Sequence, residues 1–190
     1  EIAPEEEGAM DFISNVKNEV VVSIAHTVAN YDTAIKAFKQ GARHVTHFYN
    51  AMPPFLHREP GVIGAASDTK GIYVELICDG IHIHPSVVRS TFKFIGDERM
   101  ILISDSMEAT GMPNGKYSLG GQAVEFVGNK PTLVSDGSIA GSATNLMDCM
   151  KNAIKNMGIP LESAIRAAAV NPAKSIGIFD NYGSLEPGKV

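Results

Sequence analysis

Four short apolar runs recur along the chain, with starts roughly 24 to 28 residues apart. They are "VVVSIAH" (20–26), "HVTHFYN" (44–50), "IYVELICDG" (72–80) and "MILISDS" (100–106). Each run is rich in Val and Ile and nearly continuous in hydrophobicity, which is typical of parallel strands buried on both faces. The pattern therefore predicts four parallel strands.

Helical periodicity fills most of the gaps between these runs. The stretch 30–41 begins with an asparagine that can cap a helix and ends with a glycine that can stop it. The stretch 84–96 has a proline in its expected first turn and a final glycine. The gap 51–71 shows no clear helical pattern and is predicted as a long loop.

The pattern changes after the fourth run. Alternating residues and the turn pairs "GN" and "DG" predict a small antiparallel β-hairpin insert at about 115–140. A helix capped by Ser142 and ended by Gly158 should follow, and then a second helix up to Asn171-Pro172. The repeated order of strand and helix predicts an α/β fold with a parallel sheet.

Composition and charge exclude some classes of function. The 190 residues are 44% hydrophobic and 19% charged, as in a globular domain. A net charge of −5 without a basic run gives no footprint for nucleic acid, and no run of about 18 apolar residues would span a membrane. Cys78 and Cys149 are expected to be reduced core thiols, and the cytoplasm is the expected location. Both ends of the sequence look cut, which suggests a piece of a longer chain.

Polar groups able to do chemistry follow each predicted strand. They are His26, His47, Asp79 with His82, and Asp105. Ligands of parallel α/β proteins bind outside the carboxyl ends of the strands. The four strand ends are therefore the candidate site.

His26 and His47 stand at matching strand ends, and adjacent strands lie about 4.8 Å apart. Their imidazoles can converge on one metal ion, although a single histidine is more often a core or rim residue. Asp105 suits a carboxylate that binds a metal or moves a proton, with a helix cap as the alternative. His84 can instead cap the helix that starts at Pro85.

The segment "THFYNAMPPFLHREPG" combines an amide, two prolines and an arginine in one loop. The Asn50 side chain and free backbone N–H groups at Ala51 suit an anion. Arg58 adds a planar fork that matches phosphate. An ordinary surface loop with an exposed arginine is the alternative.

Several segments together resemble the N-acetylglucosamine-6-phosphate deacetylases, a family of the amidohydrolase superfamily. They are "GARHVTHFYNAMPPFLHREPG", "AHT", "CDGIHIHP", "LISDS", "GSIAGSATNL" and "NPAKSIGI". The resemblance implies the C-terminal half of a metal-dependent (β/α)8 TIM-type barrel, with strands five to eight and a small β-hairpin insert. The N-terminal barrel strands and most of the small β domain would be absent.

The resemblance also implies a reaction, in which metal-activated water removes acetate from the 2-acetamido group of N-acetylglucosamine 6-phosphate. His26 and His47 would hold a divalent metal, zinc or iron, and Asp105 would be the catalytic acid/base. A homodimer is implied, with Arg58 reaching the neighbouring site. The implied substrate-binding residues are Asn50, Ala51, Arg58, Asp79, Gly80, Ile81, His82, Ile139, Ala140 and Gly141.

One element of the family pattern has no counterpart in the sequence. The family's third protein ligand is a glutamate in an "LEGP"-like segment, and Glu5 in "APEEE" matches a different strand-end element. A non-catalytic fragment is therefore the alternative to the deacetylase, and the chain by itself is expected to be inactive. An amidohydrolase acting on cyclic amides is a weaker alternative.

Overall fold

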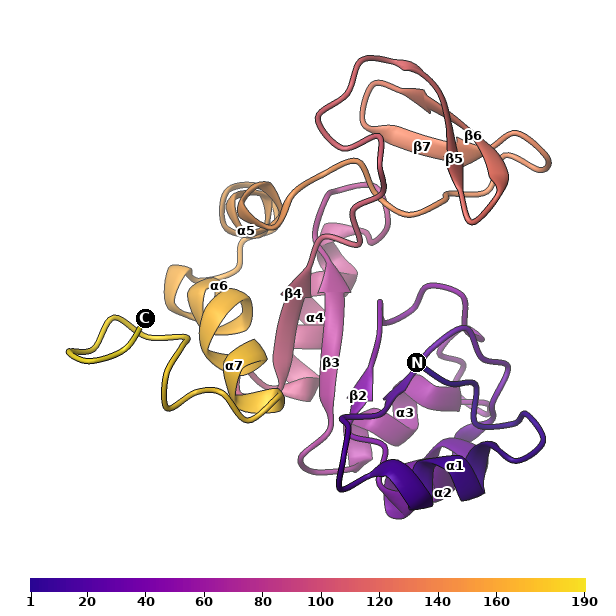
Figure 1. The fold of residues 1–190 in the computed structure, drawn as a ribbon, viewed down its shortest axis with the longest axis vertical. Coiled ribbons are helices and arrows are strands. Elements are labelled where there is room, and N and C mark those ends of the chain that lie inside the picture. The colour runs from indigo at the N-terminus through magenta and orange to yellow at the C-terminus, as the bar shows by residue number, and fades with distance from the viewer.

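A computed structural model describes residues 1–190 and places a four-stranded parallel sheet at the centre (Figure 1). The strands lie in chain order: β1 (Ser23–Ile24), β2 (His44–Val45), β3 (Tyr73–Ile77) and β4 (Met100–Ile103). The prediction of four parallel strands is confirmed. The strands are shorter than the predicted runs, because the last residues of each run leave the sheet and form the loops described below.

Helices cover one face of this sheet and bury its alternate residues. They are α1 (Ala9–Val16), α2 (Tyr31–Gln40), α3 (Gly61–Asp68) and α4 (Pro85–Ile95). Val74 and Leu76 of β3 are fully buried in the resulting core. The predicted caps are confirmed: the Asn30 side chain accepts from the Thr33 N–H at 2.9 Å, and His84 accepts from the Ser86 N–H.

The prediction of a long loop over 51–71 is wrong in its second half, where α3 lies. The helix contains small residues that are buried almost all round, so it has no polar face to mark its period. Gly64 lies against the N-cap residue of its own helix, where a built Cβ would lie 2.5 Å from Cβ of Pro60. Because the helix has no polar face, its sequence shows no hydrophobic periodicity from which it could be predicted.

A second, smaller sheet follows β4. Its antiparallel strands are β5 (Gly115–Leu119), β6 (Gln122–Val127) and β7 (Lys130–Leu133). In Figure 1 it stands beyond the carboxyl end of β4, apart from the helices. It has its own cluster of buried residues, separate from the main core: Met107, Ala109, Val124, Phe126 and Ala140.

The helix α5 (Leu146–Lys155) is capped by Asn145, whose side chain accepts from the Asp148 N–H at 2.9 Å. The predicted cap at Ser142 is therefore wrong. Ser142 is fully buried, and its hydroxyl donates to the Ser104 carbonyl, so it ties the segment before α5 to the end of β4.

The last helical segment continues past the predicted stop at Asn171-Pro172. It consists of α6 (Leu161–Ile165), the π-helical turn η1 (Arg166–Val170) and α7 (Asn171–Ser175). Pro172 lies in the first turn of α7, where a missing N–H is tolerated. The buried Asn171 side chain donates to the carbonyls of Asp97 and Met100, so this turn is fixed against the start of β4.

The other face of the sheet carries polar groups. His44, Thr46 and Glu75 line a cavity of about 490 Å³ there, and His44 Nδ1 lies 3.2 Å from a carboxylate oxygen of Glu75. Cys78 and Cys149 are free and buried, as predicted. None of the helices has the length and apolar character needed to cross a membrane.

Candidate active site

Unusual backbone conformations mark the strand ends. Five residues other than glycine have positive φ, and four of them were candidate site residues on sequence grounds: His26 (47°), His47 (32°), Ala51 (50°) and Asp105 (50°). A Cβ disfavours this left-handed region, so such residues persist only where the surrounding structure holds them. Strain of this kind gathers at functional sites, and here three strand ends share it.

His26 and His47 point their rings at each other. Their Nε2 atoms lie 3.0 Å apart, and the ring planes are nearly perpendicular at 87°. His47 is 5% exposed, and its Nδ1 is buried without a hydrogen-bond partner. The predicted convergence of the two imidazoles is therefore present in the structure.

The pair fits the nitrogen ligands of a divalent cation. Zinc–nitrogen bonds of 2.0–2.1 Å place two ligands of a tetrahedral ion about 3.3 Å apart, close to the observed separation. No group of three His, Cys, Asp or Glu side chains is arranged to hold a metal. Glu5 is not a third ligand, since its carboxylate accepts from the Thr27 hydroxyl and from the Val28 N–H at 2.6 Å.

The two histidines and Asp105 line one cavity of about 380 Å³ at the carboxyl ends of the strands. Burial raises the pKa of the Asp105 carboxyl, and the imidazoles of His47, His82 and His26 act in the opposite direction. A carboxyl group with a raised pKa beside two imidazoles can accept and return a proton.

His82 also lines this cavity, whereas Asp79 lies behind it. Asp79 Oδ2 accepts from His82 Nδ1 at 2.7 Å, and its Oδ1 accepts from the backbone N–H groups of Ile81 and His82. Gly80 faces Asn152 instead, and a Cβ built at Gly80 would lie 3.1 Å from Asn152 Nδ2. Of the four predicted substrate contacts in this loop, only His82 reaches the cavity.

Asn50 and Ala51 border the cavity from the loop after β2. The Asn50 side-chain NH2 donates to the carbonyls of His47 and Phe48, and the Asn50 backbone N–H also donates to His47. The N–H groups of Asn50 all donate within the chain, whereas the backbone N–H of Ala51 makes no hydrogen bond within the chain. The free anion donor in this loop is therefore Ala51.

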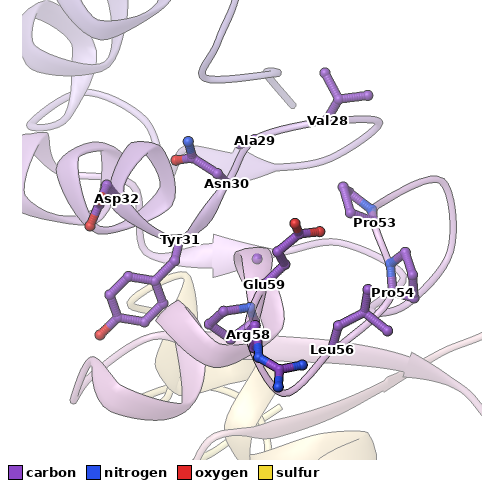
Figure 2. A pocket seen from close by; sticks show the side chains of 12 residues that line it. Val28, Ala29, Asn30, Tyr31, Asp32, Pro53, Pro54, Leu56, Arg58 and Glu59 are labelled. Atoms are coloured by element: carbon purple, nitrogen blue, oxygen red, sulfur yellow. The ribbon is translucent and has the colours of Figure 1, made fainter.

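Arg58 lies outside this cavity. It lines a second one of about 460 Å³ between the start of α2 and the loop before α3. Figure 2 shows Asn30 and Tyr31 on one side of this cavity and Pro53, Pro54 and Leu56 on the other. Within one chain, Arg58 and the two histidines therefore serve different cavities.

The hairpin sheet closes one side of the first cavity. Ile139 and Gly141 line it as predicted, whereas Ala140 is buried in the separate hydrophobic cluster of the small sheet. Sequence reasoning missed Met107 and Leu119, which also line the cavity. Both belong to the predicted insert and its approach, where apolar residues are usually assigned to the core.

The sequence of the chain is similar to those of known proteins. The profile of the Amidohydrolase family matches residues 6–190. The chain is 41% identical over 189 residues to the N-acetylglucosamine-6-phosphate deacetylase of Bacillus subtilis (strain 168), covering 99% of this chain and 48% of that protein. It is 38% identical over 189 residues to the N-acetylgalactosamine-6-phosphate deacetylase of Escherichia coli O157:H7, covering 99% and 50%.

Solved structures show the same similarity. The crystal structure of N-acetylglucosamine-6-phosphate deacetylase from Pasteurella multocida superposes with a TM-score of 0.93 at 32% identity, covering 100% of this chain and 49% of that one. The chain thus spans about half the length of the curated relatives it matches.

Proposed function

Because the chain belongs to the amidohydrolase family, we propose that its residues serve the hydrolysis of N-acetylglucosamine 6-phosphate to glucosamine 6-phosphate and acetate. The observation that carries the proposal is the convergence of His26 and His47 at 3.0 Å in one cavity with Asp105. The substrate named for the similar deacetylases supports the substrate class. In this proposal β1 to β4 correspond to strands five to eight of the family's barrel.

The two imidazoles would hold a divalent cation, zinc or iron, through Nε2. When bound, such a cation supplies Lewis-acid polarisation and lowers the pKa of a water molecule. The surrounding structure keeps the His47 ring from turning away, because His47 is almost fully enclosed. In the structure these two imidazoles are not joined by a third His, Cys, Asp or Glu side chain arranged to hold the same ion.

Asp105 acts as the proton carrier of the reaction. It accepts a proton from the attacking water and delivers it to the amine, which departs only when protonated. The raised pKa that burial gives this carboxyl brings its proton affinity closer to the working range of a general acid. The same side chain can therefore serve both proton transfers.

The phosphate is held by the loop after β2 in this proposal. Ala51, whose backbone N–H makes no hydrogen bond within the chain, lines the cavity beside the histidines. Arg58 lines the other cavity of its own chain, and in a homodimer it would reach the phosphate of the neighbouring site. Arginine suits this role because its guanidinium binds phosphate with two parallel hydrogen bonds.

The test is acetate release by purified protein carrying this chain, with N-acetylglucosamine 6-phosphate and the unphosphorylated sugar as substrates. Arg58→Ala should raise KM for the phosphorylated sugar by about 10-fold or more and leave the neutral sugar nearly unchanged. Arg43→Ala, an exposed arginine just before β2, is the matched control. Equal effects of Arg58→Ala on both substrates would remove the phosphate assignment.

A second candidate is the galactosamine epimer, because one relative with that name is 38% identical over 189 residues. The two substrates differ only in the direction of one hydroxyl. The ratio of kcat/KM for N-acetylglucosamine 6-phosphate and N-acetylgalactosamine 6-phosphate decides between them. A ratio well below one would assign the galactosamine activity.

A further inference from the structure

Asp79 and His82 form a buried hydrogen-bonded pair beside the active-site cavity. Both side chains are 5% exposed, and Asp79 Oδ2 lies 2.7 Å from His82 Nδ1. The second carboxylate oxygen accepts from the N–H groups of Ile81 and His82 at 2.9 and 3.0 Å. Both oxygens of Asp79 are thus engaged within the chain, and only His82 lines the cavity.

The charge of Asp79 determines which ring nitrogen of His82 carries hydrogen. Burial raises the pKa of Asp79, but the hydrogen bonds from His82 and Ile81 outweigh burial and leave that pKa below its usual value. The carboxylate is therefore ionised at neutral pH and can only accept. His82 Nδ1 must then be the donor, and Nε2 is the ring nitrogen left for the cavity.

We propose that Asp79 is a positioning residue that holds neutral His82 as its Nδ1–H tautomer, so that Nε2 presents an acceptor to a donor group of the substrate. The identity of that substrate rests on the proposed function. An amino-sugar phosphate offers hydroxyl and amide N–H donors to such an acceptor. Asp79 acts through His82 and makes no substrate contact of its own, contrary to the expectation from sequence.

The substitution Asp79→Asn tests this role and keeps the hydrogen bonds that hold the loop. Asparagine keeps the oxygen that accepts from Ile81 and His82, so the Asp79-Gly80 turn retains its hydrogen bonds. Its NH2 group replaces the oxygen that faces His82. The ring must then accept at Nδ1 and carry its hydrogen on Nε2, which turns the acceptor in the cavity into a donor.

Long-range ¹H–¹⁵N NMR at about pH 9, where a free imidazole is neutral, distinguishes the two tautomers. His82→Gln identifies the His82 signals by their loss. We expect a protonated Nδ1 in the wild type and a protonated Nε2 in Asp79→Asn. The matched control is Asp136→Asn, since Asp136 accepts from the Ser138 N–H in another Asp-Gly turn. This control should leave the His82 tautomer unchanged.

A protonated Nε2 in the wild type, or the same tautomer in Asp79→Asn, would overturn the proposal. The wild-type spectrum decides alone if the variant does not fold. Turnover adds a second readout: Asp79→Asn should lower kcat/KM by about 10- to 100-fold. A reversed tautomer with normal turnover would remove the positioning role. Absence of any deacetylation by the wild-type full-length protein that carries this chain would defeat the proposed function and leave the tautomer result standing.

Discussion

His47 sits in the left-handed region with a φ of 32°, where a Cβ is strained. We expect His47→Gly to be more stable than His47→Ala. Both substitutions remove the imidazole and its contact with His26. The difference between the two variants therefore isolates the effect of one Cβ atom on this backbone.

The magnitude follows from two opposing contributions. A residue with a Cβ in the left-handed region is strained by roughly 1–2 kcal/mol. Glycine loses roughly 0.5–1 kcal/mol relative to alanine, because its unfolded chain has more freedom. The net difference should be about 0.5–1 kcal/mol in the free energy of unfolding, in favour of glycine.

Urea unfolding followed by far-ultraviolet circular dichroism measures this difference. The matched pair is Lys36→Ala and Lys36→Gly at an exposed position of α2, where glycine should be less stable than alanine by about 1 kcal/mol. The expected result is that glycine is more stable than alanine at His47 and less stable than alanine at Lys36. If glycine is less stable than alanine at His47 by a similar amount, the strand end carries no strain and the argument from its φ fails.

Three further results are expected. Asp105→Asn should lower turnover by about 100-fold or more while substrate binding stays within a few-fold, and near-normal turnover would show that another group moves the proton. The folded-state pKa of Asp79 is lowered, so its carboxylate stabilises the fold above the unfolded pKa of about 3.9 and this contribution is lost as the pH falls through the lower folded value. The stability difference between wild type and Asp79→Asn at pH 7 should therefore shrink below about pH 4, and a difference constant down to about pH 2 would contradict this. Because β4 has no strand beyond it, light scattering should show a dimer or larger assembly, and a monodisperse monomer would refute this.

Much of the parallel sheet and of the candidate site could be predicted from sequence, because two independent signals coincide at each strand end. The apolar runs define the strands, and the polar residue that ends each run must lie at one edge of the sheet. His26, His47 and Asp105 follow this rule, and they line one cavity. What the sequence could not provide is the conformation at those ends, since positive φ at a histidine has no compositional signature.

The errors share a physical origin in tertiary contacts. The helix α3 is buried along most of its length, and such a helix needs no amphipathic pattern. Ser142 has the right chemistry for a cap, but a buried carbonyl at Ser104 takes its hydroxyl instead. The predicted stop at Asn171 fails because that side chain donates to two strand-side carbonyls and holds the helix in place.

The small antiparallel sheet has a hydrophobic cluster separate from the main core, so we expect it to unfold as a cooperative unit of its own. The unit with fewer buried residues opens at a lower free energy, because fewer apolar contacts are lost when it does. Leu119 and Ile139 belong to this unit and form one wall of the cavity, whereas His47 belongs to the unit with the larger core. We therefore expect local unfolding of the insert to remove a wall of this cavity while the contact between His26 and His47 persists.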